Sequence, residues 1–136
     1  MVQERAVSPG PRTSIQIRVR YAECDPQRVA HHSVYAVWLE AARTELLREQ
    51  GVAYAELEAK GIYFVVARMS FRFHRPALYD DVLRVEVEVK RSGGVKIEHT
   101  YAIWRDEQLL ARAETTLACV DGHGKLRPVV EALSSD

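Results

Sequence analysis

The alternation of apolar and polar positions near the N-terminus predicts a β-strand. The segment SIQIRVRY, residues 14–21, alternates apolar side chains with glutamine and arginine, which is the two-residue period of a strand with one buried face. The strand is expected to end at the turn signal Asp25-Pro26. Residues 1–13 lack any apolar period and place proline, glycine and proline in succession, so they predict a disordered tail. The domain is therefore expected to span residues 14–136.

The middle of the chain has the period of a long, largely apolar helix. From Ser33 to about Gln50, apolar residues recur every three or four positions and cover most of the helix circumference. Such a helix must be covered by other elements on more than one side. Gly51 is expected to end it, and the segment VAYAELEAK, residues 52–60, predicts a shorter second helix.

The remainder of the chain predicts further strands. They are expected at residues 62–75, 83–91, 95–104 and 109–120. The short segments SGG (92–94) and RDE (105–107) join the later strands and are typical of hairpin turns. Hairpins make neighbouring strands antiparallel. One strand, one long buried helix and then four strands therefore predict an α+β domain whose antiparallel sheet curls around the helix.

Composition narrows the classes of protein that fit. With 136 residues, of which 47% are hydrophobic, the chain suits one domain with a sizeable core. The 19 basic and 19 acidic residues cancel, so we expect no binding to nucleic acid. No stretch has the roughly 20 apolar residues of a membrane span, and no signal peptide is recognisable, which predicts a soluble, cytoplasmic protein. Cys24 and Cys119 are expected to be reduced thiols.

Side chains that could take part in catalysis lie close together in the segment YAECDPQRVAHHSVY, residues 21–35. Asp25 stands where a strand turns toward a helix, so its carboxylate and the helix start can line one small cavity. The first amides of a helix lack intrahelical partners and carry the positive end of the helix dipole, so they can stabilise an oxyanion. A carboxylate beside them can activate water or attack a carbonyl. This pair suits a thioester, whose carbonyl has little resonance stabilisation and whose thiolate leaves readily.

Several alternatives for these residues stay open. Asp25 before a proline is equally typical of a turn that its side chain stabilises. Adjacent histidines point to different sides of a regular element, so a metal site made by His31 or His32 with Asp25 and Glu23 is less favoured. Cys24 with a histidine would resemble a cysteine hydrolase, although cysteine is more often a small buried residue.

Two long segments resemble a known family. RVRYAECDPQRVAHHSVYAVWLEAARTELLREQG, residues 18–51, is similar to the strand, catalytic loop and central helix of the hotdog-fold acyl-CoA thioesterases of the 4-hydroxybenzoyl-CoA thioesterase and YbgC type. RMSFRFHRPALYDDVLRVEVEV, residues 68–89, is similar to the strands that follow, with the turn R-P-A-x-Y-D-D. The resemblance covers nearly the whole chain. It implies a hotdog fold, in which the sheet wraps around the central helix, and an acyl-CoA thioesterase activity.

The resemblance also implies roles for individual residues. Asp25 is the catalytic carboxylate, acting as base or nucleophile, and the backbone amide of His32 polarises the thioester carbonyl. Tyr21 and the His32 ring support them in the same pocket, and His31 and Tyr35 are expected to contact the substrate. Taken without the resemblance, both tyrosines are more often core aromatics. No cofactor is needed, because coenzyme A is part of the substrate, and no metal is expected.

The same resemblance implies how the chains assemble and that the protein must bind the phosphates of its substrate. Hotdog sheets pair edge to edge, which implies a homodimer or homotetramer with active sites at the interface. In that arrangement the later turn with His74, Arg75 and Tyr79 is expected to come from the partner subunit. Coenzyme A carries phosphates that a protein of zero net charge must bind locally, although a charged hairpin tip is usually only solvated. The best basic cluster for these phosphates comprises Lys90, Arg91 and Lys96.

Two positions depart from the family pattern. Arg28 stands where the family usually has glycine, and Ala30 stands where it has a larger aliphatic residue. Glycine permits a positive φ that arginine adopts only at a cost. The loop is therefore expected to take a different path and to change the shape of the acyl pocket.

Two other functions compete with hydrolysis. A noncatalytic protein of the same fold would bind acyl-CoA or acyl carrier protein as a sensor or scaffold. A dehydratase acting on 3-hydroxyacyl thioesters would need a histidine paired with a carboxylate, which His31 or His32 with Asp25 could imitate. The products separate the three: free thiol for hydrolysis, an enoyl thioester for dehydration and neither for a binding protein.

Overall fold

The computed structural model describes residues 10–130, which form an α+β domain. In chain order its elements are β1 (Arg12–Arg18), the 3₁₀ helix η1 (Tyr21–Glu23), α1 (His32–Glu49), α2 (Tyr54–Ala59), β2 (Tyr63–Phe73), β3 (Val82–Gly93), β4 (Lys96–Arg105) and β5 (Gln108–Val120). Both predicted helices and all the predicted strands are present. The rest of the predicted tail, residues 1–9, lies outside the described residues.

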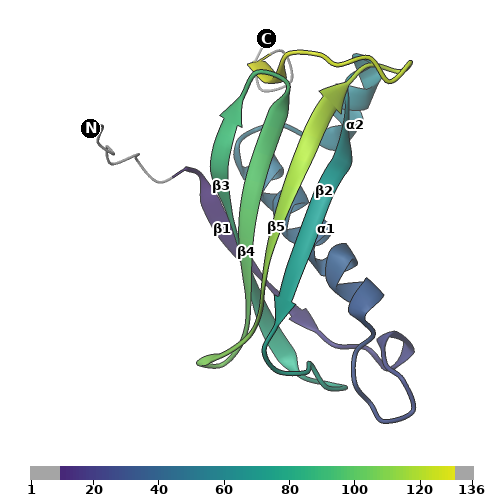
Figure 1. Cartoon of the computed structure of the whole chain (residues 1–136), viewed down its shortest axis with the longest axis vertical. Coiled ribbons are helices and arrows are strands. Elements are labelled where there is room, and N and C mark those ends of the chain that lie inside the picture. The colour runs from purple at the N-terminus through teal and green to yellow at the C-terminus, as the bar shows by residue number, and fades with distance from the viewer. Residues whose placement is uncertain (1–9, 131–136) are drawn as a thin grey trace.

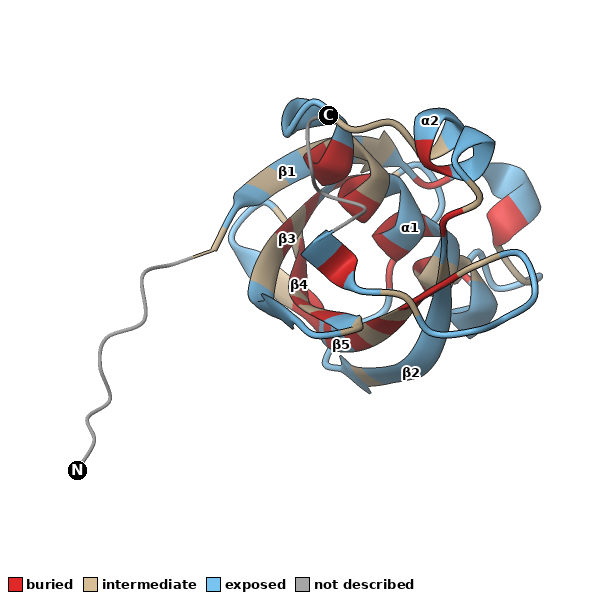
Figure 2. Cartoon of the chain, turned by 90° about the horizontal axis from the view of Figure 1, so that it is seen from above, coloured by how far each residue is buried: buried red, intermediate tan, exposed pale blue. Residues whose placement is uncertain are grey.

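The strands form one antiparallel sheet in the order β1-β3-β4-β5-β2 (Figure 1). Hairpins join β3, β4 and β5, as predicted, while β1 and β2 occupy the two edges. The pairings of β2 with β5, β3 with β4 and β4 with β5 each contain a break in register, and such bulges increase the local twist. The sheet therefore curls around α1, as the view from above shows (Figure 2).

Helix α1 lies on the concave face of the sheet and packs mainly on β1 and β3. Its buried positions include Tyr35, Trp38, Leu39, Ala42 and Leu46, which recur at the helical period. They meet the inward-facing side chains of the sheet in one core cluster. Burying each large apolar side chain contributes about 1.5–3 kcal/mol, so this layer holds the helix on the sheet. None of the described helices is long and apolar enough to cross a membrane.

The predicted limits of the first strand need correction. β1 begins at Arg12, which pairs with Glu88, so residues 12 and 13 belong to the sheet and not to a tail. β1 ends at Arg18, and Tyr21 begins η1 instead of continuing the strand. The alternation extends further in the sequence, but Val19 exchanges hydrogen bonds with the turn that precedes β3 and so leaves the ladder.

Two elements, α1 and β2, leave apolar side chains uncovered. On α1, Val37 is 56% exposed, although an apolar helix of this kind was predicted to need cover on more than one side. The edge strand β2 also exposes a row of apolar side chains by 37–46%, namely Tyr63, Val65, Val66, Met69 and Phe73. A long edge strand of this kind is a template for pairing with another chain.

Candidate active site

The loop that was predicted to carry the chemistry doubles back on itself between η1 and α1, at the lower end of the sheet in Figure 1. The amide of Asp25 donates to the carbonyl of Val29 at 2.9 Å, and the amide of His31 donates to the carbonyl of Glu23 at 2.9 Å. These bonds join the residues after η1 to the residues before α1. Asp25 and the start of α1 therefore belong to one tightly bonded loop.

The two carboxylate oxygens of Asp25 differ in their surroundings. Oδ1 accepts hydrogen bonds from the amides of Gln27 at 2.8 Å and Val29 at 3.1 Å, which is the turn-stabilising role considered above. Oδ2 accepts none from the described residues, and the residue is half-buried. The structural and catalytic interpretations are thus compatible, because one oxygen holds the loop while the other stays available to a reacting molecule.

Helix α1 begins at His32, and its first amides have no intrahelical acceptor. The preceding residue, His31, provides no side-chain cap, and the first turn contains no acidic side chain. The helix's own residues therefore leave the positive end of its dipole without a negative partner. A carbonyl oxygen that becomes negative during a reaction can be stabilised at such a position.

Arg28 adopts the left-handed conformation that glycine takes most easily, with a φ of 67°. Its amide donates to the carbonyl of Asp25 at 2.8 Å, and its carbonyl accepts from the amide of Tyr79 at 2.9 Å. The positive φ that glycine would permit is therefore present at this position. Arginine takes the positive φ itself, at a cost of about 1–2 kcal/mol, because hydrogen bonds on both sides hold its backbone.

A buried carboxylate, considered in the sequence only as a metal ligand, ties η1 to α1. Glu23 is 7% exposed. It accepts hydrogen bonds from the Arg20 amide at 2.8 Å, the Arg20 guanidinium at 3.2 Å and the indole N–H of Trp38 at 3.3 Å. A buried tryptophan usually finds an acceptor for its N–H, but nothing in the sequence identifies which residue provides it.

The turn of residues 75–81 packs against the loop of its own chain, where the Tyr79 amide donates to the carbonyl of Arg28. Leu78 forms a bridge with Val29. Tyr79 therefore lies beside the loop within one chain, and the prediction that it comes from the partner subunit is wrong.

Arg105, at the end of β4, donates to the Asp81 carboxylate at 2.6 Å and to the carbonyl of Pro76 at 3.2 Å. No sequence pattern marks Arg105, because its partners come from a distant part of the chain. Its two bonds hold the turn in the position that closes one side of the loop.

The predicted supporting side chains separate into an exposed and a buried group. Tyr21 is 71% exposed and meets Tyr79 edge to face at 5.5 Å between ring centroids. The His32 ring meets Phe73 at 4.9 Å. Tyr35, by contrast, is 2% exposed, its hydroxyl accepts from a backbone amide of the neighbouring turn, and burial raises its pKa. Within one chain Tyr35 is a core residue, and the other aromatic groups form the accessible surface beside the loop.

The structure also bears on the alternative chemistries. Burial and the carboxylates of Glu23 and Asp25 raise the pKa of the free Cys24 thiol, which disfavours the thiolate that a cysteine hydrolase needs. No group of three or more histidine, cysteine, aspartate or glutamate residues within residues 10–130 could hold a metal ion. Neither His31 nor His32 donates a hydrogen bond to Asp25 in this part of the chain.

The basic cluster proposed for the phosphates lies far from the loop within one chain. Lys90, Arg91 and Lys96 flank the hairpin between β3 and β4, whereas the loop lies beside the start of β3 (Figure 1). Eight steps of extended strand, about 26 Å, separate Val82 from Lys90. Lys90 also forms an exposed ion pair with Glu114 at 3.9 Å. A single chain therefore does not bring the cluster to Asp25.

Comparison with known proteins identifies the family. The family model described as the thioesterase superfamily matches residues 27–112, more than half of the chain. The acyl-CoA thioester hydrolase YbgC of Escherichia coli is 35% identical over 106 residues, which cover 77% of this chain and 79% of that protein. The acyl-CoA thioesterase YbgC of Haemophilus influenzae is 35% identical over 117 residues, covering 85% of this chain and 85% of that protein.

Solved structures agree with this result. The crystal structure of a probable thioesterase from Bartonella henselae matches with a TM-score of 0.81 at 30% sequence identity, covering 85% of this chain and 97% of that chain. The chain therefore belongs to the thioesterase superfamily. Its curled sheet around one long helix is the hotdog fold, and the predicted resemblance to the YbgC type is confirmed. The family match begins at residue 27, so it does not include Asp25.

Proposed function

We propose that the protein is an acyl-CoA thioesterase that hydrolyses acyl-CoA to a free acid and coenzyme A. One observation carries the proposal. A carboxylate oxygen without a hydrogen bond from the described residues, Oδ2 of Asp25, shares a tightly bonded loop with the uncapped start of α1. The names of the YbgC relatives support an acyl-CoA as the substrate.

The reaction uses few groups. The thioester oxygen binds at the backbone amide of His32, where the helix start stabilises negative charge. Asp25 takes a proton from water as the water oxygen attacks the carbonyl carbon. The C–S bond of the tetrahedral intermediate then breaks, and the proton held by Asp25 passes to the departing thiolate. In the nucleophilic form of this mechanism, Asp25 attacks the carbonyl directly and the C–S bond breaks as coenzyme A leaves as a thiolate. Water then hydrolyses the resulting anhydride and supplies the proton for the thiolate.

Asp25→Asn tests the role of the carboxylate. Asparagine keeps an oxygen that can accept the two backbone amides of the turn, so the loop is expected to stay folded while the base is lost. We expect thiol release to fall at least about a hundredfold. Asp121 is a matched control, because its Oδ1 also accepts two backbone amides, at 2.8 and 3.0 Å, in the turn after β5. Asp121→Asn should leave hydrolysis unchanged.

The assay follows thiol release from short-chain, long-chain and aromatic thioesters of coenzyme A and of acyl carrier protein. Equal activity of the native protein and Asp25→Asn would refute the role of Asp25. If the native protein binds acyl-CoA but releases no thiol from any substrate, it is a binding protein. If an enoyl thioester forms instead, it is a dehydratase. The preferred acyl group follows from the same panel.

We further propose that two chains pair through their β2 edges to form a homodimer, from which a tetramer can assemble. The exposed apolar side chains of β2 and the uncovered side of α1 support this proposal. Val66→Lys should lower the mass measured by light scattering. Leu126→Lys, which changes an apolar side chain that is 61% exposed outside β2, should leave it unchanged. A native protein that is monomeric at all concentrations would refute the pairing.

The dimer would also supply the phosphate contacts. In it, we propose that Lys90, Arg91 and Lys96 of the partner subunit bind the nucleotide phosphates of coenzyme A. Replacing all three with alanine should raise KM several-fold for an acyl-CoA, because phosphate contacts are electrostatic. The KM for the corresponding acyl-pantetheine, which lacks the nucleotide, should not change. An equal change for both substrates, or no change for either, would refute this assignment.

A further inference from the structure

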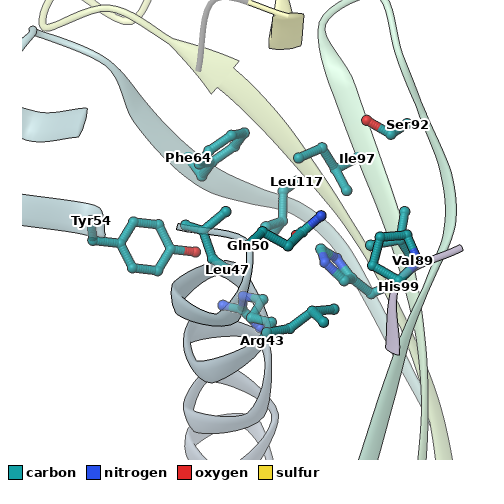
Figure 3. A pocket seen from close by; sticks show the side chains of 12 residues that line it. Arg43, Leu47, Gln50, Tyr54, Phe64, Val89, Ser92, Ile97, His99 and Leu117 are labelled. Atoms are coloured by element: carbon teal, nitrogen blue, oxygen red, sulfur yellow. The ribbon is translucent and has the colours of Figure 1, made fainter. Parts of the chain in front are cut away.

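A cavity lies between the C-terminal half of α1 and the sheet, away from the loop with Asp25 (Figure 3). Its volume is about 90 Å³. At about 30 Å³ for each water molecule, it can hold about three waters or one small organic molecule. Most of its wall is apolar and includes Leu46, Leu47, Phe64, Ile97 and Leu117.

Two polar side chains are buried at this cavity without a full set of partners. Arg43 from α1 is 8% exposed and His99 from β4 is 6% exposed. Figure 3 shows them on adjoining walls of the same space. Nε of Arg43 and Nδ1 of His99 have no hydrogen-bond partner among the described residues. Buried polar atoms are almost always paired, so two unpaired atoms at one cavity point to a bound group.

The charge at the cavity indicates the kind of group. The Arg43 guanidinium donates to the Tyr101 hydroxyl at 3.4 Å, and that hydroxyl bonds to Thr115 at 2.7 Å. The Tyr54 hydroxyl also interacts with Arg43, and burial raises the pKa of this hydroxyl, so none of these partners is charged. Arg43 forms no ion pair within residues 10–130. A buried guanidinium binds a carboxylate more strongly than a neutral acceptor, through charge-assisted hydrogen bonds.

His99 can contribute a hydrogen bond without adding charge. Burial and the nearby Arg43 lower the pKa of His99 to about 4, so its imidazole is neutral near pH 7. A neutral imidazole donates one N–H, and Nδ1 is buried without a partner among the described residues, so the tautomer with its proton on Nδ1 can donate into the cavity. Arg43 and His99 together therefore offer one cation and one further donor to an anion.

We propose that this cavity binds a small free monocarboxylate of the size of acetate or propionate. The carboxylate accepts hydrogen bonds from Arg43 and His99, and the short carbon chain contacts the apolar wall. The unpaired donors select an acceptor, the buried guanidinium selects negative charge, and the volume limits the chain to a few carbons.

The proposed carboxylate site is distinct from the proposed catalytic loop. Arg43 lies about 16 Å along α1 from His32, and the buried side chains of Tyr35, Leu39 and Ala42 belong to the core cluster between them. Exposed lining residues, Gln50 and Ser92, connect the cavity with solvent. The inference is independent of the proposed function, because a carboxylate can bind here whether or not the protein hydrolyses thioesters.

The test is a titration of the full-length, ¹⁵N-labelled protein with propionate, followed by amide chemical shifts. Propionamide serves as the matched ligand, because it has nearly the same shape and no charge. We expect saturable shifts around the cavity with propionate and at least about tenfold weaker binding of propionamide. Octanoate, whose chain is longer than the cavity, would have to extend through the opening at Gln50 and Ser92 and should bind no more tightly than propionate.

Variants locate the binding. Arg43→Met keeps the length of the side chain and removes the charge, so propionate binding should be lost, whereas Arg43→Lys should retain part of it. Asp25→Asn should bind propionate as the native protein does. If Arg43→Met does not fold, the comparison of propionate with propionamide in the native protein decides the question.

Three results would overturn the proposal. Propionate that shifts no signals near the cavity would mean that the cavity holds only water. Equal binding of propionamide would show that the charge of Arg43 is not recognised. Shifts confined to the loop of Asp25, and absent from Asp25→Asn, would place the carboxylate in the catalytic site instead.

Discussion

Replacing Arg28 with glycine is expected to stabilise the protein without removing a side-chain contact. Arg28 has a φ of 67°, a conformation that costs a residue with a Cβ atom about 1–2 kcal/mol. Its side chain is exposed and forms no hydrogen bond or ion pair with other described residues. The bonds of its own backbone amide and carbonyl do not depend on the side chain. The substitution therefore relieves backbone strain and changes little else.

The magnitude follows from two opposing contributions. Glycine adopts the positive φ without the steric cost that a Cβ atom brings. It also loses more conformational entropy on folding, and this loss cancels about 0.5–1 kcal/mol of the gain. The proper reference is Arg28→Ala, which removes the same side chain and keeps the Cβ atom. Relative to that variant, we expect Arg28→Gly to be more stable by about 0.5–1 kcal/mol. For a chain of 136 residues, this corresponds to about 2–4 °C in Tm.

Urea unfolding measures this difference, followed by the fluorescence of the buried Trp38. All variants are compared at one protein concentration, because association would shift the apparent stability. Gly61→Ala is the reverse control, since Gly61 has a φ of 77° and no atom within 4 Å of an added Cβ. It should lose about 1 kcal/mol. If Gly61→Ala behaves as expected but Arg28→Gly is no more stable than Arg28→Ala, strain at Arg28 is refuted.

Other perturbations test the supporting network. Glu23→Ala should lower the free energy of unfolding by about 2–4 kcal/mol, because a buried indole N–H loses its acceptor, whereas the exposed Glu58→Ala should change it little. Arg105→Ala should cost about 1–3 kcal/mol and raise KM, because the turn beside the loop loses a half-buried partner; urea unfolding and steady-state kinetics check both. The unfolded chain binds a proton at His99 near pH 6.5 and the folded chain only near pH 4. The contribution of His99 to the free energy of unfolding is therefore complete above pH 6.5 and should fall by about 3 kcal/mol on acidification to pH 4. His99→Phe should remove this slope from the pH profile of urea unfolding.

Local patterns in the sequence were sufficient to predict the elements. Strand alternation depends on side chains two positions apart and helical periodicity on side chains three or four apart, so both can be read without knowing the fold. This is why the predicted long helix and the later strands agree with α1 and with β3, β4 and β5. The same local order placed Asp25 in the turn before the helix. The prediction was wrong at the limits of β1, because pairing with β3 and the turn before it decides where that strand begins and ends.

The tertiary structure alone decided which distant residues meet. The strand order β1-β3-β4-β5-β2 cannot be derived from the positions of the strands along the chain. The pairing of Glu23 with Trp38 and of Arg105 with Asp81 could therefore not be predicted. The positive φ of Arg28 is likewise imposed by hydrogen bonds to other segments and opposes its own preference. The cavity at Arg43 likewise depends on how α1 packs against the sheet, because its lining residues come from distant parts of the chain. The sequence determined the elements and the residues available for chemistry, and the packing of those elements determined which side chains are buried, paired or left without a partner.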